Sequence, residues 1–242
     1  MAEYLNLVIS AKSKVWRVDD KNFSITGNSG WAITRTAILK RDDYTCRFCG
    51  FHSKSYQEVH HLDDDHNNDA SENLVTACSF CHQVHHIGLA GISGSAKLAW
   101  MPELTHQEIN HLMRSKFVLS YWLKRRDQNT RSDDLSMLRS AESAFDGMVK
   151  ARCDKVRVEM GTDSPISLGN AIINAPNQGR LERQIRLMGI RLVPTGTIFR
   201  DGEDVLPKMI ESWLTPSGAY AGMQPSAWAE HLGQHLDHLR DF

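Results

Sequence analysis

Residues 46–86, CRFCGFHSKSYQEVHHLDDDHNNDASENLVTACSFCHQVHH, hold two Cys-x-x-Cys pairs on either side of a His-His pair. The pairs are Cys46/Cys49 and Cys78/Cys81. Each pair on a tight turn presents two thiolates to one ion, and two pairs complete the closed four-sulfur site of structural zinc. Unligated reduced cysteines are the alternative, and a thioredoxin-like redox role fits less well because no βαβ pattern surrounds either pair. We therefore predict that these four cysteines bind Zn²⁺.

Three histidines in the same stretch have a spacing that suits a second metal site. The segment is predicted to form two strands and a helix, at residues 59–62, 74–77 and 79–88. His82 and His86 are then i and i+4 on one helix face, beside His60 on the first strand. Three neutral imidazoles leave an open coordination position, which four thiolates do not. The alternative is a zinc-stapled scaffold without a second ion, and His52, His66 and His85 are expected to be exposed side chains.

This order of residues resembles the HNH, or ββα-metal, nuclease motif. The resemblance implies that His61 is the general base that activates water for attack on a phosphodiester. It implies that Asn73 braces the loop that orients His61. His60, His82 and His86 would hold one divalent ion, Mg²⁺, Mn²⁺, Ni²⁺ or Zn²⁺, which would stabilise the charge that develops on the phosphate.

The flanking segments narrow the resemblance. They are residues 38–51, 54–59, 73–81, 101–105, 165–169 and 191–194, with Phe199 and Arg200. Together they resemble the IcmJ/DotN family of type IVB secretion systems, over about residues 4–213. The resemblance implies a zinc-bound, HNH-like docking module of the cytoplasmic coupling complex. Its partners would be the type IV coupling ATPase or its adaptor proteins.

Members of that family often lack the catalytic-type histidines, whereas this sequence keeps His60, His61, His82 and His86. Two functions therefore stay open at this point. One is an IcmJ/DotN-like component of a secretion or conjugation coupling complex, with or without HNH nuclease chemistry. The other is a stand-alone metal-dependent HNH endonuclease that cleaves DNA.

The composition is that of an ordinary globular chain and does not by itself indicate a nucleic-acid-binding protein. The 242 residues are 41% hydrophobic and 24% charged, with a formal net charge of -1. Proteins that bind nucleic acid are usually basic, although a local patch is sufficient. Arg35, Lys40, Arg41 and Arg47 precede or enter the first cysteine pair and are candidates for phosphate contacts. A solvated helix face explains them equally well, and DNA stays a candidate partner.

Cysteine usage and hydropathy predict a cytoplasmic protein. Four paired cysteines and a lone Cys153, expected to be an inert thiol, suit a reducing compartment. The N-terminus lacks the pattern of a signal peptide, and no apolar run is long enough to span a bilayer. We therefore expect no direct membrane insertion, and any location at the inner face of the membrane would depend on a secretion complex.

The predicted fold class is α+β, with a zinc-bound HNH-like domain followed by a mostly helical domain. The predicted divisions are residues 1–104, with N-terminal strands and a helix, the helical domain 105–214, and a linker with a C-terminal amphipathic helix at 215–242. In the first part we expect two short strands within 4–18, a helix at 31–41, a loop at 88–95 and a strand at 97–100.

In the second part a capping box, Thr105-x-x-Glu108, opens a helix that extends to about residue 126. A second long helix is expected at about 133–159, antiparallel to the first. Further helices are expected from Pro165, up to Gly189, at 205–214 and after Ser226, with a loop or extended piece at 191–195. The last helix is too short to be stable alone, so it docks either on the body or on a partner. His231 on it is expected to be a surface residue.

Overall fold

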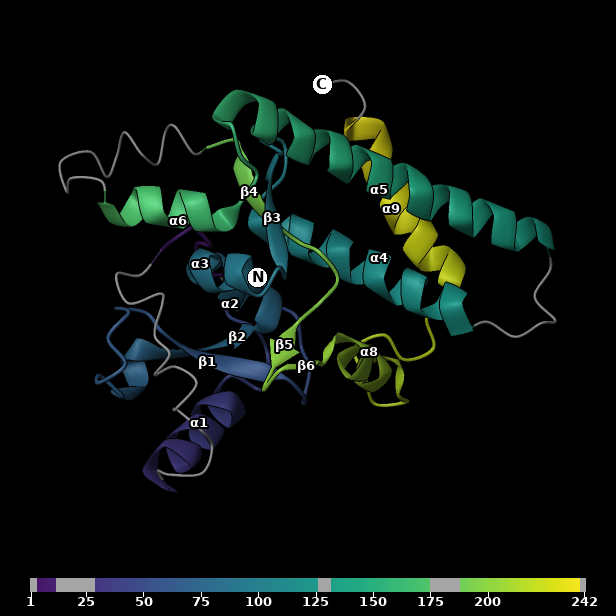
Figure 1. Cartoon of the computed structure of the whole chain (residues 1–242). Coiled ribbons are helices and arrows are strands. Elements are labelled where there is room, and N and C mark those ends of the chain that lie inside the picture. The colour runs from purple at the N-terminus through teal and green to yellow at the C-terminus, as the bar shows by residue number, and fades with distance from the viewer. Residues whose placement is uncertain (1–3, 12–28, 126–131, 175–187, 240–242) are drawn as a thin grey trace.

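The computed structural model describes residues 4–11, 29–125, 132–174 and 188–239 (Figure 1). Its helices are α1 (Ser29–Arg41), α2 (Ser79–His85), α3 (Ile87–Ile92), α4 (His106–Arg125), α5 (Ser132–Met160), α6 (Pro165–Asn174), α8 (Leu206–Leu214) and α9 (Pro225–Leu239), with a 3₁₀ turn η2 (Ser71–Asn73). Its antiparallel strand pairs are β1 (Gln57–His61) with β2 (Leu74–Cys78), β3 (Ala96–Trp100) with β4 (Ile190–Pro194), and β5 (Phe199–Arg200) with β6 (Glu203–Asp204). Helices combined with small sheets agree with the α+β class.

The β1–β2 hairpin lies between helices. α1 packs against both strands, and α2 leaves β2 directly at Cys78 and also contacts both strands (Figure 1). All five residues of β2 are buried, as expected for a strand covered on both faces. Arg35 and Arg41 of α1 donate hydrogen bonds to the backbone oxygens of Gln57 and Leu74, at 2.7 Å each. Two of the four candidate phosphate-binding cations are therefore used to attach α1 to the hairpin.

The prediction of a loop at residues 88–95 is wrong, because α3 occupies most of it. The predicted helix at 79–88 ends at His85, and His86 has φ -126° and ψ 50° between α2 and α3. α3 packs against α6, and a Cβ on Gly91 would lie 2.7 Å from a side-chain carbon of Ile166 and 2.9 Å from its backbone nitrogen. Gly91 therefore serves a close helix–helix contact, whereas Gly94, with φ 66° and open space beside it, is a turn glycine of the kind that the sequence pattern indicates.

The N-terminal segment is also not the strand that its alternation predicts. Residues 4–11 form no strand, and they run across the first cysteine turn and the end of α2. The amide of Leu5 donates to the Arg47 oxygen at 2.9 Å, and the amide of Ser10 donates to the Val84 oxygen at 3.1 Å. The second predicted strand, within 15–18, and the predicted helix that leads to Gly189 lie outside the described residues.

The second half of the chain is built on α4, α5 and α9, which lie side by side in Figure 1. α4 and α5 run antiparallel, as predicted, and α9 packs against both. Trp228 and Leu232 of α9 are buried, so the last helix docks on the body. His231 is only half-exposed, and its Nδ1 lies 2.9 Å from Ser115 Oγ on α4. Among the described helices, none combines the length and the apolarity that crossing a bilayer would take.

One strand pair connects the two predicted domains. β3 comes from the first and β4 from the second, with Leu98 opposite Leu192. The extended alternative for residues 191–195 is therefore the one observed. Buried side chains of both halves form one cluster. The two predicted domains therefore share one buried core across the boundary at residue 104. Their division into two folding units stays a prediction.

The capping box at the start of α4 is confirmed and leads to a stability prediction. Glu108 Oε2 accepts hydrogen bonds from the backbone nitrogen and the Oγ1 of Thr105, at 2.7 and 2.8 Å, and the Glu108 amide donates to Thr105 Oγ1 at 3.2 Å. We expect Thr105→Ala to lower the free energy of unfolding by about 1 kcal/mol. Urea unfolding measures it, with Thr36→Ala on the exposed side of α1 as the control, which should cost less than about 0.5 kcal/mol. Equal losses in the two variants would contradict the capping role.

His106 on α4 makes stability depend on pH. Its Nε2 accepts a hydrogen bond from the Leu192 amide at 3.1 Å, so the folded chain needs the neutral imidazole. Burial, helped by the charge of Arg191, lowers the pKa of His106 to about 3. A folded pKa below the unfolded value of about 6.5 means that this stabilisation is complete above pH ~6.5 and is lost as the pH falls toward ~3.

The expected result is that wild type loses about 2 kcal/mol more than His106→Gln between pH ~7 and pH ~5. Glutamine can still accept the hydrogen bond from Leu192 but takes up no proton. Urea unfolding at both pH values measures the difference. Parallel pH profiles for the two proteins would show that His106 is not the group responsible.

Candidate metal centre

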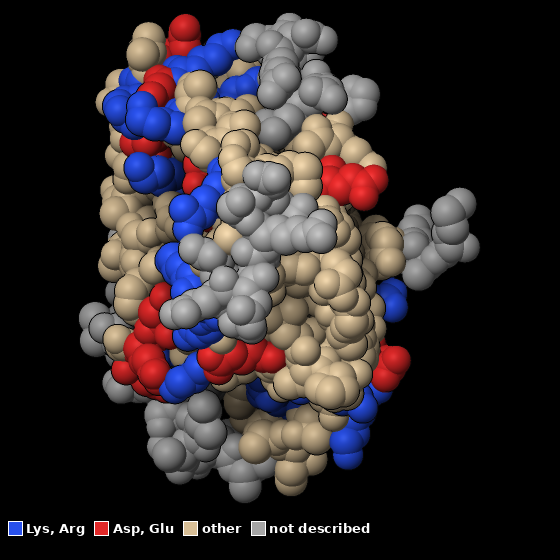
Figure 2. All heavy atoms as spheres, turned by 90° about the vertical axis from the view of Figure 1, so that its right-hand side faces the viewer, with Lys and Arg blue, Asp and Glu red and all other residues tan. Residues whose placement is uncertain are grey.

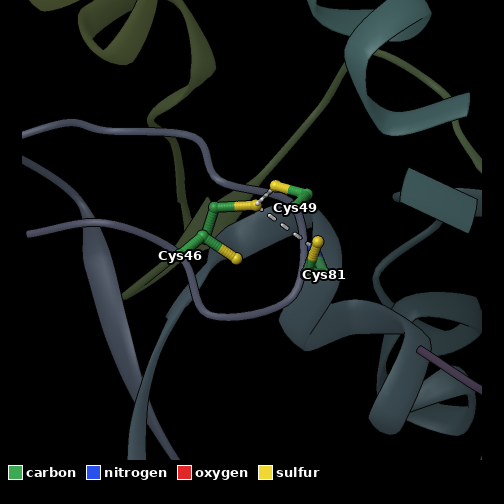
Figure 3. A group of neighbouring side chains, drawn as sticks. Cys46, Cys49 and Cys81 are labelled. Atoms are coloured by element: carbon green, nitrogen blue, oxygen red, sulfur yellow. Dashed lines mark hydrogen bonds between the residues drawn. The ribbon is translucent and has the colours of Figure 1, made fainter. Parts of the chain in front are cut away.

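The four cysteines of the two Cys-x-x-Cys pairs meet at one point. Cys46 and Cys49 lie on a turn that Gly50 closes at φ 74°, with its amide donating to the Cys46 oxygen at 2.9 Å. Cys78 ends β2 and caps α2, and Cys81 lies in the first turn of that helix. One sulfur from each lies within 4.8 Å of the others, and Figure 3 shows Cys46, Cys49 and Cys81 converging.

The spacing and burial of the sulfurs fit a closed tetrahedral site. The sulfurs of Cys49 and Cys78 are 3.7 Å apart, and a tetrahedron of sulfurs about 2.3 Å from a zinc ion has edges of about 3.8 Å. All four cysteines are buried. Burial raises the pKa of the Cys78 and Cys81 thiols well above its usual value, so that a bound cation is what makes thiolates stable there.

Two side chains of α4 donate to these sulfurs. Arg114 Nη2 lies 2.7 Å from Cys78 Sγ and 3.3 Å from Cys49 Sγ, and Asn110 Nδ2 lies 3.3 Å from Cys81 Sγ. Arg114 is 1% exposed, and its guanidinium lies 4.1 Å from the ring centre of Phe51.

The burial of Arg114 indicates that the cluster is anionic. Within the part of the chain that the structure describes, no carboxylate forms an ion pair with it. Although burial alone lowers the pKa of Arg114, the thiolates of Cys78 and Cys49 raise it well above its usual value. A buried guanidinium needs a nearby negative charge, and Zn²⁺ with four thiolates supplies a net charge of about minus two. The residues present therefore fit zinc.

The three predicted histidine ligands are also brought together. His60 extends from β1, His82 from α2, and His86 from the break between α2 and α3. One ring nitrogen of each lies within 4.8 Å of the others. His60 and His86 are buried, and the side chain of His82 is 24% exposed. Although α2 ends at His85, one residue before His86, the three histidines still converge.

Sequence reasoning missed a carboxylate and an arginine beside these histidines. Glu58 Oε2 lies 2.7 Å from His82 Nδ1, and Glu58 Oε1 accepts from Arg200 Nη2 at 2.9 Å. Burial by itself raises the pKa of Glu58, but His82, Arg200 and Ser79 hold it well below its usual value. Glu58 and His60 are two apart on one strand, so the period of two was a usable signal. No sequence signal indicated that Arg200 contacts Glu58, because Arg200 comes from the distant β5.

His85 was expected to be an exposed side chain, and it is half-buried instead. Its ring stacks on that of His60, with centroids 4.2 Å apart and planes at 22°. The ring of Phe48 also contacts the His85 ring, with centroids 4.8 Å apart. The ring therefore belongs to the wall of the three-histidine cluster.

His61 and Asn73 lie apart from that cluster. Neighbouring residues of a strand face opposite sides, and the ring of His61 stacks on Trp31 of α1 with centroids 5.5 Å apart. Its Nε2 lies 3.0 Å from Asp69 Oδ1. Asn73 Nδ2 donates to Asp63 Oδ1 at 2.8 Å, and so holds the loop that follows His61. The base role of His61 stays a prediction.

Comparison with known proteins relates most of the chain to one relative. No protein-family model matches it. The chain is 32% identical over 180 residues to the Type 4 apparatus protein DotN of Legionella pneumophila subsp. pneumophila. The match covers 73% of this chain and 75% of that protein.

Proposed function

The chain belongs to the IcmJ/DotN family, and from that membership we propose that it is a zinc-stabilised docking subunit of a type IVB secretion apparatus. The identity with DotN over three quarters of that protein's length carries the proposal. Its partners would be the coupling ATPase or the adaptor proteins beside it, at the inner face of the membrane. Zinc at the four cysteines would stabilise the fold and would not take part in catalysis, because a closed four-sulfur site leaves no coordination position for a substrate.

The charge distribution supports a protein partner for the helical half. Figure 2 shows the right-hand side of Figure 1, where Lys and Arg alternate with Asp and Glu around a broad uncharged area. A nucleic-acid surface would carry mainly Lys and Arg. A single exposed apolar side chain is ordinary on a protein surface, so Val158, 81% exposed on α5, serves as a probe of the outer face of this helix.

Affinity purification from the native host tests this proposal. The tagged chain is expected to recover components of the secretion or conjugation apparatus. Val158→Asp on α5 should reduce recovery, whereas Ile33→Asp on α1, where Ile33 is 71% exposed, should leave it unchanged. Recovery of no apparatus component would overturn the proposal. Equal recovery by both variants would exclude the outer face of α5 as the docking surface.

A second candidate function is metal-dependent cleavage of DNA phosphodiester bonds. The convergence of His60, His82 and His86 favours it, because three imidazoles leave a coordination position open to phosphate. A second divalent ion bound there would polarise the phosphate, and His61 would be the base that takes a proton from water. The departure from the motif is that the ring of His61 packs against α1.

Plasmid cleavage and metal counting test this candidate. Cleavage is expected with Mg²⁺, Mn²⁺, Ni²⁺ or Zn²⁺, with loss of activity in His61→Ala and in His82→Ala. Two ions per chain are expected in wild type and one in His82→Ala. Absence of cleavage with all four ions would remove the nuclease function, and a single zinc per chain would remove the second site.

A further inference from the structure

We propose that Glu58 and Arg200 are positioning residues of the three-histidine site. Glu58 selects the tautomer of His82 that presents Nε2 to a divalent ion, and Arg200 holds Glu58 in the orientation that does so. The inference rests on the proposal that His60, His82 and His86 bind such an ion. It makes the metal site depend on the C-terminal half of the chain.

The tautomer follows from the chemistry of the Glu58–His82 pair. Glu58 Oε2 and His82 Nδ1 are 2.7 Å apart, and an ionised carboxylate can only accept a hydrogen bond. Nδ1 must therefore carry a proton, which leaves the lone pair of the neutral imidazole on Nε2. Pairing of a ligating histidine with a carboxylate fixes the ring orientation and raises the basicity of the ligand nitrogen.

Arg200 is placed to keep Glu58 turned toward His82. Its Nη2 lies within hydrogen-bond distance of three acceptors, Glu58 Oε1 at 2.9 Å, Ser79 Oγ at 3.0 Å and the Tyr56 oxygen at 3.1 Å. These acceptors lie on β1, at the start of α2 and just before β1. One guanidinium thus ties the carboxylate to both elements that carry His60 and His82.

The hairpin that carries Arg200 is itself anchored. β5 turns into β6 through Asp201 and Gly202, at φ 51° and 82°. Asp204 Oδ1 then accepts from the amides of Ile198 and Leu206, at 2.9 and 3.1 Å, and so connects the hairpin to the start of α8. On α8, Trp213 is buried with its ring 5.3 Å from that of Phe51, beside the cysteine site. Arg200 therefore reaches Glu58 from a fixed base.

The test measures the tautomer of His82 and the metal affinity of the second site in the full chain with its cysteine site filled by zinc. NMR correlation of the imidazole nitrogens should show the proton on Nδ1 in wild type before the second ion is added. In Glu58→Ala and Arg200→Ala the tautomers should mix. Calorimetric titration with Co²⁺ should give an affinity about 10–100-fold weaker in both variants.

Glu203→Gln is the matched control. Glu203 lies on the same hairpin, pairs with Lys208 at 2.7 Å and has a 60% exposed side chain, so its loss should change neither measurement. One zinc per chain in every variant verifies that the scaffold is intact. A purely structural role of Glu58 would alter stability without mixing the tautomers.

The outcomes separate this inference from the proposal beneath it. If wild type binds no second ion, the three-histidine metal site fails and this inference falls with it. If wild type binds Co²⁺ and both alanine variants keep its affinity and tautomer, only the positioning role is overturned. Weaker binding with mixed tautomers in both variants, and not in the control, supports it.

Discussion

Replacing Cys81 with serine is expected to abolish zinc binding at the four-cysteine site and unfold the segment around β1, β2 and α2. Cys81 is fully buried, its sulfur is one of four within 4.8 Å, and Asn110 donates to it. A hydroxyl is a poor zinc ligand at neutral pH. Zinc binding of about 10–16 kcal/mol in small domains acts as folding free energy. It is as large as the total stability of a typical domain, about 5–15 kcal/mol.

Zinc content by atomic spectroscopy and thermal unfolding by circular dichroism measure this effect. Cys153→Ser is the matched control, because Cys153 is buried on α5 away from the cluster and burial raises the pKa of its thiol to about 11. It should keep the zinc content of wild type and lose about 1–2 kcal/mol of stability. Full zinc content and an unchanged melting temperature in Cys81→Ser would show that these sulfurs do not hold an ion.

Arg114→Met is expected to cost about 3–5 kcal/mol of unfolding free energy, the second-largest effect. Methionine approximates the length of the side chain and its contact with Phe51, but it donates no hydrogen bond to Cys49 or Cys78. The anionic zinc–thiolate cluster would then be buried without its compensating charge. Urea unfolding in the presence of zinc measures the loss.

Arg125→Met provides the comparison on the same helix. The side chain of Arg125 is 55% exposed, its nearest carboxylate oxygen, on Glu211, is 3.7 Å away, and its guanidinium lies 3.9 Å from the ring centre of Tyr121, so its loss should cost about 1 kcal/mol. Equal stability of the two methionine variants would mean that the sulfurs carry no charge that Arg114 neutralises. The cluster would then be one of neutral thiols, and the zinc assignment would fail.

Much of the local structure could be predicted from the residues alone. The strands β1 and β2, the start of α4 at its capping box and the proline that opens α6 lie within about two residues of their predicted places. Each depends on neighbours a few positions apart, through a hydrogen bond or a side-chain period. In α3 and residues 4–11, contacts with segments far away in the sequence determined the structure, and the local pattern predicted it wrongly.

The sequence by itself determined which side chains could ligate a metal, because ligand types and their spacing on a turn or helix are local properties. It predicted both groups, the four cysteines and the three histidines, that the structure brings within 4.8 Å. Only the tertiary structure decided which charges support them. Arg114 and Arg200 reach these groups from elements far along the chain, and Arg114 is buried beside the sulfurs because packing encloses it there. No pattern of neighbouring residues in the sequence predicts that burial.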